Sequence, residues 1–348
     1  MSDTINKKNI EVSSQTVKPW VSILIPVYKV EDYIERCARS VFEQTYPNIE
    51  YIFVNDCTPD RSMEVLERVM KDYPERAAHT RIIRFEKNQG VATMRNMLVD
   101  ACQTDWLMHV DSDDWIEHDL VEELVKKQLE TGADMVISGV YCHMKGCNYS
   151  RRFLDSDQKE DFLKLVFSSW DWNNVWGNLI RRSVYTDNNI HVSTGFYSGE
   201  DLRTIFHLTY HAKSIAWARK DGYHYDCSRT SRISDLNTKK LRKVYTGYVN
   251  SLAEARSFVA EKMPEYLELL DTGKCMTIHN QFLYNSFTFG DKELHGMAKA
   301  GIRDILRRYP SLHGSLLDRM KRELKYHYWI ARPLIKWYGK CLTVIKGV

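Results

Sequence analysis

Several common signals are absent from this sequence. It has no run of about eighteen apolar residues, so no segment is predicted to cross a membrane as a helix. Residues 1–19 are polar and lack the apolar core of a secretory signal, and we expect them to form a flexible lead. None of the eight cysteines stands in a C-x-x-C pair, which favours reduced, buried thiols in a cytoplasmic protein over a disulfide or zinc framework.

Two glycine-rich phosphate motifs are also absent. The sequence contains neither G-x-G-x-x-G nor G-x-x-x-x-G-K-[ST], so neither a standard dinucleotide-binding fold nor a P-loop is supported. The net charge is only +3, which implies no general field for nucleic acid.

The 348 residues allow one large domain with an appendage, or two domains. In the first part of the chain, apolar runs of strand length alternate with segments of helical spacing. Strands are predicted at Trp20–Val27, Ile49–Asn55, Arg81–Phe85, Trp106–Val110 and Asp134–Gly139, and helices at Asp32–Gln44, Asp60–Asp72, Asn88–Cys102 and His118–Thr131. This alternation predicts an α/β fold with a mostly parallel sheet covered by helices on both faces.

An acidic run, Asp111-Ser112-Asp113-Asp114, follows the predicted strand Trp106–Val110. Clustered carboxylates at the end of a buried strand cost free energy unless a cation or a set of donors neutralises them. The alternative is a polar turn with Asp113 or Asp114 as the N-cap of the next helix. Asp56 also follows a strand, and ligands of such sheets bind beyond the carboxyl ends of the strands. This common edge favours a metal–diphosphate site, with Asp114 left to cap the helix.

A second acidic pair, Glu200-Asp201, precedes an apolar helical pattern at Leu202–His211. Acids in the first turn of a helix are favoured by its dipole, and the same pair suits general-base chemistry if the fold brings it to the first acidic run. Spacing alone leaves both interpretations open. Trp170, Trp172 and Trp176 are candidates for stacking on an acceptor sugar, with core packing as the alternative.

The end of the chain differs in character. From Lys239 onward, long helical patterns predict a helical extension at residues 236–320, with helices at Leu241–Val259, Pro264–Phe289 and Leu294–Arg308. Residues 321–348 carry seven basic residues and one acidic residue, with apolar residues at helical spacing. A basic amphipathic helix of this kind lies either on an anionic membrane surface or on its own core.

The segment Val21–Gly139 resembles the nucleotide-sugar half of the inverting family-2 glycosyltransferases, which have the GT-A fold. The similarity rests on VSILIPVYKVEDYIERCARSVFEQTYPNIEYIFVNDCTPDRS, NQGVATMRN and DSDDWIEHD, and it continues more weakly through WGNLIRRSVY, GEDLRTIFHL and YHYDCSRTSRIS. The resemblance implies a GT-A domain at residues 20–235, with a nucleotide-sugar half at 20–140 and an acceptor half at 141–235. The helical extension would follow it.

The resemblance also implies roles for individual residues. Pro26, Tyr28 and Glu31 would line the base and ribose pocket, and Asp56 would accept the N3–H of uracil. Arg95 would approach the base or the diphosphate, Asp111 would face the ribose, and Ser112 would belong to the same nucleotide-sugar site. Asp113 would hold a divalent cation, Mn²⁺ or Mg²⁺. Asp201 would be the catalytic base, with Glu200 supporting it. The usual Gly-Ser pair after the equivalent of Asp56 is replaced here by Cys57-Thr58.

We therefore expect a metal-dependent, inverting hexosyltransferase that moves one sugar from a UDP-sugar to a hydroxyl of a glycan or lipid-linked acceptor, as in surface polysaccharide synthesis. The family's processive synthases have a Gln-x-x-Arg-Trp segment, which is missing here. A non-catalytic nucleotide-sugar-binding subunit on the same fold and a nucleotidyltransferase are the alternatives. We expect a cytoplasmic protein, peripheral at the inner face of the cell membrane if the last helix binds lipid.

Overall fold

The computed structural model describes residues 18–312, except 145–146, 152–153, 170, 196 and 228–237. The predicted lead at residues 1–17 and the predicted basic helix at 321–348 therefore lie outside the described residues. The chain divides into two compact units after Leu267. Among the described helices, none combines the length and the apolar character that crossing a bilayer requires.

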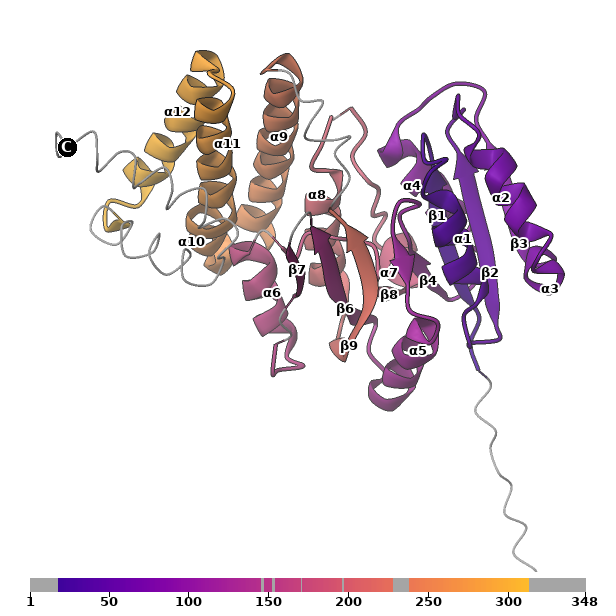
Figure 1. The fold of residues 1–348 in the computed structure, drawn as a ribbon. Helices are drawn as coiled ribbons and strands as arrows, with labels where there is room; N and C mark the ends of the chain where they lie inside the picture. Colours follow the sequence, from indigo (N-terminus) through magenta and orange to yellow (C-terminus); the bar gives the residue numbers. More distant parts are fainter. Residues whose placement is uncertain are drawn as a thin grey trace, which may run out of the picture. The chain divides into compact units, whose positions relative to one another are not determined.

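The first unit begins with strands that alternate with helices, as the apolar pattern predicts (Figure 1). The strands are β1 (Val21–Val27), β2 (Ile49–Asn55), β3 (Thr80–Arg84) and β4 (Trp106–His109). The helices are α1 (Ile34–Phe42), α2 (Ser62–Met70), α3 (Pro74–Ala77) and α4 (Val91–Ala101). The four strands are parallel in the order β3-β2-β1-β4, so their carboxyl ends share one edge of the sheet.

The sheet continues with strands of both directions. β8 (Leu179–Arg181) runs antiparallel to β4 and joins it to β6 (Met135–Met144), which is followed by β9 (Ile215–Asp226) and β5 (Trp115–Ile116). β7 (Cys147–Ser150) pairs with the far end of β6. β6 and β9 are parallel, whereas β5 and β9 are antiparallel. The parallel sheet predicted from the sequence is thus extended into a mixed nine-stranded sheet within the described residues.

Apolar side chains of both parts of the sheet form one continuous core. Buried residues from β1, α1, β2, β4 and α5 (Leu120–Thr131) belong to it, among them Ile23, Val41, Phe53, Met108 and Leu124. The remaining helices of the first unit are α6 (Lys159–Ser168), α7 (Arg182–Thr186), α8 (Glu200–His211) and α9 (Thr238–Lys262). Helix α9 contacts α8, so the compact first unit extends past the boundary expected at residue 235.

The first unit ends with a 3₁₀ turn (Pro264–Tyr266). The described part of the second unit is helical, in keeping with the predicted extension. There α10 (Leu267–Leu270), which begins at the boundary, and a π-helical turn (Asp271–Cys275) lead into α11 (Met276–Thr288), which packs on α12 (Lys292–Arg308). The sequence predicts one helix over Pro264–Phe289, and the π turn interrupts it. At that turn the buried Asp271 accepts hydrogen bonds from Arg308 and from the Tyr309 hydroxyl. A 3.6-residue period does not reveal such an inserted residue.

Candidate active site

The acidic run directly follows β4. Asp111, Asp113 and Asp114 each offer a carboxylate oxygen, and these oxygens all lie within 4.8 Å of one another. Asp111 and Asp113 are partly exposed, whereas Asp114 is buried. Two accessible carboxylates at the carboxyl end of a buried strand match the oxygen ligands that Mn²⁺ and Mg²⁺ prefer.

Asp114 has a different role from the one that the sequence suggests. Helix α5 begins at Leu120 with Asp119 as its N-cap residue, so the prediction that Asp114 caps this helix is wrong. The Asp114 carboxylate instead accepts hydrogen bonds from the Tyr223 hydroxyl at 2.7 Å and from the Asp226 backbone N–H at 2.9 Å. Burial raises the pKa of Asp114, and the charges of Asp113 and Asp111 raise it further. Asp114 therefore ties the acidic loop to β9.

Arg95 of α4 contacts both the acidic run after β4 and the pair Glu200-Asp201, which lie some ninety residues apart in the sequence. Its Nη2 donates to Asp111 Oδ1 at 3.1 Å and to Asp201 Oδ2 at 3.4 Å, and its Nε lies 3.3 Å from Asp201 Oδ1. The Arg95 side chain is only 3% exposed. Burial lowers the pKa of this guanidinium, but the carboxylates of Asp111 and Asp201 outweigh burial and the net pKa is raised. Arg95 is thus a buried, charged side chain that links Asp111 of the acidic run to Asp201 of the acidic pair.

Asp201 reaches Arg95 from the first turn of α8, which begins at Glu200. The preceding Gly199 adopts a positive φ of 87°, and its carbonyl accepts a hydrogen bond from the Ser251 hydroxyl of α9. The two acids therefore occupy the turn where the helix dipole favours negative charge, and Asp201 also pairs with Arg95. The first-turn position is confirmed, and the general-base role stays a prediction whose requirement, proximity to the first acidic run, is met through Arg95.

Asp56 is buried at the end of β2 and binds the loop that opens α4. Its carboxylate accepts hydrogen bonds from Asn88 Nδ2 at 2.8 Å, the Gln89 N–H at 2.6 Å and the Gly90 N–H at 2.9 Å. The adjacent Cys57 is exposed with a positive φ of 55°. The glycosyltransferases that the sequence resembles usually have glycine at this position, and glycine adopts such a conformation without strain.

The other predicted nucleotide residues surround the ends of β1 and β4. Pro26 is buried within β1, Tyr28 follows that strand and is half-buried, and Ser112 is buried in the acidic loop. Glu31 accepts a hydrogen bond from the Arg61 N–H at 3.0 Å. These residues lie at the edge that the topology gives to the carboxyl ends of the strands.

The predicted acceptor tryptophans are not surface platforms where the structure describes them. Trp172 and Trp176 are each 5% exposed, and Trp170 lies outside the described residues. Trp172 contacts Trp217 edge to face at 4.9 Å between ring centroids, and Trp176 stacks on Tyr223 at 4.3 Å. Both indoles thus have the core-packing role named as the alternative.

Tyr223 and His109 are site residues that the sequence reasoning missed. The Tyr223 hydroxyl donates to Asp114 and accepts from the Asp111 N–H at 3.1 Å, so it fixes both ends of the acidic run. His109 is buried, and burial together with the charge of Arg95 lowers its pKa. Only the weak YHYD similarity signalled Tyr223, and His109 is one letter in an apolar run.

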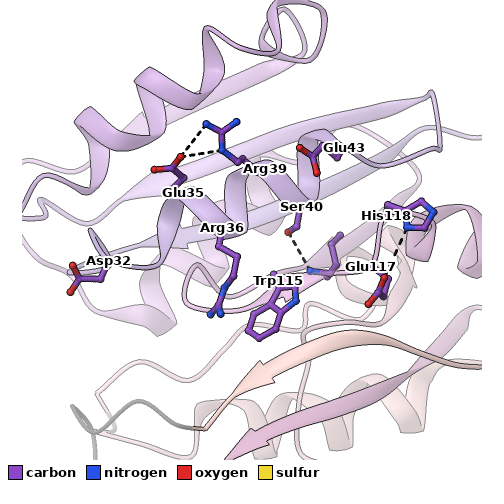
Figure 2. Close-up of a pocket in the computed structure, with 10 residues that line it drawn as sticks. Asp32, Glu35, Arg36, Arg39, Ser40, Glu43, Trp115, Glu117 and His118 are labelled. Carbon is purple, nitrogen blue, oxygen red and sulfur yellow. Dashed lines mark hydrogen bonds and ion pairs between the residues drawn. The ribbon is translucent and has the colours of Figure 1, made fainter.

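A pocket of about 630 Å³ lies beside α1 and β5, but it is distinct from this site (Figure 2). Its lining includes Arg36, Arg39, Ser40, Trp115 and Glu117, and none of the three clustered aspartates. Arg36 links it to the acidic loop through the Asp113 carbonyl at 3.3 Å. We assign the candidate site to the acidic edge, where Arg95 contacts both Asp111 and Asp201.

Comparison with known proteins identifies the family. The model of the family described as "Glycosyl transferase family 2" matches residues 22–206, which is more than half of the chain. The chain belongs to glycosyl transferase family 2. EpsH of Bacillus subtilis (strain 168), a protein whose name assigns it to the glycosyltransferases, is 29% identical over 279 residues, which cover 73% of this chain and 74% of EpsH.

Solved structures show that this family-2 chain has the fold of GT-A glycosyltransferases. Staphylococcus aureus TarS 1–349 in complex with UDP-GlcNAc superposes with a TM-score of 0.54 at 14% identity, covering 86% of this chain and 92% of that one. The mannosyltransferase PcManGT of Pyrobaculum calidifontis, in complex with GDP-Man and Mn²⁺, gives a TM-score of 0.56 at 16% identity, with 93% and 85% covered. At these identities the likeness concerns the fold.

Proposed function

We propose that this family-2 glycosyltransferase is a metal-dependent, inverting enzyme that transfers single hexosyl units from a UDP-sugar to a hydroxyl of a glycan or lipid-linked acceptor. The observation that carries the proposal is the bridge through Arg95, which brings Asp201 and Asp111 within reach of one guanidinium. A general base and a diphosphate-binding cluster must adjoin each other for a direct displacement.

The chain's own residues supply the proton transfer and the positioning. The Asp201 carboxylate accepts the proton of the acceptor hydroxyl as that oxygen attacks the anomeric carbon from the side opposite the nucleotide. One displacement of this kind inverts the anomeric centre. Arg95 holds the base in place and adds a positive charge near the leaving diphosphate. Glu200 supports the first turn of α8 next to the base.

A divalent cation fits the acidic run because Asp111 and Asp113 are partly exposed and their oxygens are within 4.8 Å of those of Asp114. Asp113 would hold the ion with Asp111 beside it, while Asp114 remains bound to Tyr223. When bound, Mn²⁺ or Mg²⁺ would act as a Lewis acid that stabilises negative charge on the departing diphosphate.

The ligands bound by structural neighbours support a nucleotide-sugar donor. TarS was solved with UDP-GlcNAc and with UDP, and PcManGT with GDP-Man and Mn²⁺. For this chain, Asp56 would recognise uracil, and Pro26, Tyr28, Glu31 and Ser112 would complete the nucleotide site. The buried Asp56 carboxylate already accepts three N–H groups, so a further contact with uracil has to share an oxygen.

Binding of UDP by calorimetry tests the donor site separately from catalysis. We expect UDP to bind in the presence of Mn²⁺, and Asp113→Asn to weaken binding at least tenfold while leaving the melting temperature nearly unchanged. Binding of GDP in preference to UDP would contradict the assignment of uracil as the nucleobase. Metal-independent binding of UDP would contradict the role of Asp113.

The segment at residues 321–348 is proposed to hold the enzyme at an anionic membrane surface, on the grounds of its basic residues. Deletion of residues after about Lys321 should release the protein from anionic liposomes while activity on a soluble acceptor persists. Equal liposome binding with and without this segment would refute the proposal.

A further inference from the structure

Two cysteines meet at the end of the longest strand pair of the sheet. Cys142 lies in β6, and Cys227 directly follows the last residue of β9. The parallel register places Cys142 beside Tyr225 and His143 beside Asp226. Because side chains alternate along strands, Cys142 and Cys227 project from the same face of the sheet. The Cys227 N–H donates to the His143 carbonyl at 2.8 Å, which holds Cys227 against β6.

The two thiols affect each other. Interaction with the Cys227 thiol lowers the pKa of Cys142, the same interaction raises the pKa of Cys227, and both cysteines are free thiols in this structure. Cys142 is fully buried, whereas Cys227 is partly exposed and packs at the margin of the same core. A small oxidant therefore reaches the pair from the Cys227 side.

A buried arginine faces this pair. The Arg151 guanidinium donates to the Asp171 carbonyl and to Asn174 Oδ1, the latter at 2.9 Å. Burial lowers the pKa of this guanidinium, and the nearby Cys142 raises it. Interaction with Cys227 and, against the opposing effect of burial, the positive charge of Arg151 lower the pKa of Cys142. A thiolate in an electropositive setting is the reactive form of cysteine.

We propose that Cys142 and Cys227 are a redox-sensitive pair that forms a reversible disulfide when the protein meets hydrogen peroxide. One sulfur attacks peroxide and becomes a sulfenic acid as hydroxide leaves, and the second sulfur displaces another hydroxide from it. The two thiol protons convert both hydroxides to water. The two sulfurs are oxidised, and the peroxide is reduced. Cys227 lies beyond the end of β9, where a small backbone shift can meet the geometry of a disulfide.

A disulfide between Cys142 and Cys227 would alter the acidic loop through Asp226, which precedes Cys227 in the chain. The Asp226 N–H binds Asp114 at 2.9 Å, and its carboxylate pairs with Arg36 at 2.8 Å, which in turn donates to the Asp113 carbonyl. A covalent bond at Cys227 displaces or fixes Asp226. We therefore expect oxidation to change Mn²⁺ affinity by about three- to tenfold, an effect that rests on the proposed function.

Peptide mass spectrometry of the full chain tests the disulfide itself. After exposure to peroxide and alkylation of the remaining thiols, a Cys142–Cys227 peptide lighter by two hydrogen atoms should appear, and a phosphine reductant should remove it. Cys142→Ser and Cys227→Ser should each abolish this peptide. Cys57→Ser, which removes an exposed thiol, should leave it intact. Oxidation confined to Cys57, or linkage between other cysteines, would overturn the proposal.

Calorimetric titration with Mn²⁺ separates the two claims. The oxidised wild type should differ from the reduced wild type, whereas Cys227→Ser should bind Mn²⁺ equally under both conditions. A mapped disulfide with unchanged Mn²⁺ affinity would overturn the coupling to the acidic loop. Absence of Mn²⁺ binding to the reduced protein would contradict the proposed function, and the mass spectra would still decide the disulfide.

Discussion

At the scale of single residues, Arg95 links the two groups of carboxylates in the candidate site. It is buried and contacts carboxylates from two distant segments, so removal of its charge leaves Asp111 and Asp201 without this shared cation. Lysine keeps the charge but has no planar fork that can contact both carboxylates at once. The consequences of changing Arg95 are therefore specific to this geometry.

Arg95→Lys should lower kcat about a hundredfold, because displacement of a catalytic group by about 1 Å has an effect of this size. Steady-state release of UDP measures it. Arg68→Lys, at a side chain that is 64% exposed and pairs with Glu35, is the matched control and should retain full activity. Wild-type kcat in Arg95→Lys would show that the bridge does not position the base.

The two acids of α8 should differ in their effects. Asp201 contacts Arg95, whereas no such contact is described for Glu200, so Asp201→Asn should reduce kcat by about 10²–10⁴ and Glu200→Gln by about tenfold or less. Rates of transfer at saturating donor compare them directly. A larger loss in Glu200→Gln would make Glu200 the base.

Sequence alone indicates which residue types belong to the site but not their environment. Asp111, Asp113 and Asp201 were predicted from strand ends and family similarity, and the topology does bring them together. The burial of Trp172 and Trp176 depends on Trp217 and Tyr223 of β9, which pair with them only in three dimensions. The bond between Tyr223 and Asp114 spans over a hundred residues, so no local pattern reports it.

At the scale of elements, the turn before β8 supports the site through Gly177. Its N–H donates to the His109 carbonyl at 2.9 Å, its φ is +75°, and a Cβ there would lie 2.9 Å from Tyr223 Cδ2. Alanine at this position therefore adds backbone strain and a clash with the ring that holds Asp114.

Gly177→Ala should destabilise the protein by about 1–3 kcal/mol more than Gly132→Ala. Gly132 also has a positive φ, at the end of α5, but a Cβ there meets no atom within 4 Å. Denaturant unfolding compares the two variants, and Mn²⁺ affinity should fall only in Gly177→Ala. Equal destabilisation would show that the contact with Tyr223 has no energetic consequence.

The packing of α8 on α9 should depend on pH through His207. Its ring lies 3.9 Å from that of Phe258, and burial, with Arg203 and His211 nearby, lowers the pKa of His207 to about 4. Because this pKa is below the unfolded value of 6.5, the stabilising contribution is full above pH 6.5 and is lost as pH falls toward 4. Stability should drop by about 1–2 kcal/mol between pH 8 and 5 on this account.

Thermal unfolding of the wild type and of His207→Gln over that pH range measures this loss. The variant should show a shallower decline toward acid pH, because it lacks the group that gains a proton on unfolding. Parallel curves for both proteins would assign the acid sensitivity to other groups.

Elements with strong local patterns were predictable, and elements defined by pairing were not. The buried runs at β1, β2 and β4 each coincide with a predicted strand. β5 and β8 are only two and three residues long, and each exists because a neighbouring strand supplies hydrogen bonds. The π turn at Asp271–Cys275 likewise accompanies an ion pair between the buried Asp271 and Arg308 that periodicity does not show.

At the scale of the whole molecule, the α/β class and the helical extension followed from the sequence. The alternation of strands and helices predicts the parallel half of the sheet, and the scarcity of breakers after Lys239 predicts helices. The limit of the first compact unit at Leu267 depends on the contact between α9 and α8, which helical spacing in α9 leaves undetermined. The predicted basic helix lies outside the described residues.

The central claim is that the acidic run and Asp201 form one metal-dependent catalytic site. Release of UDP from a panel of UDP-sugars tests it most directly, with Mn²⁺ or with a chelator, for the wild type, Asp113→Ala and Asp201→Ala. We expect Mn²⁺-dependent release from at least one donor, lowered at least a hundredfold by either substitution. Unchanged turnover in both variants, or equal release in the chelator, would contradict the account.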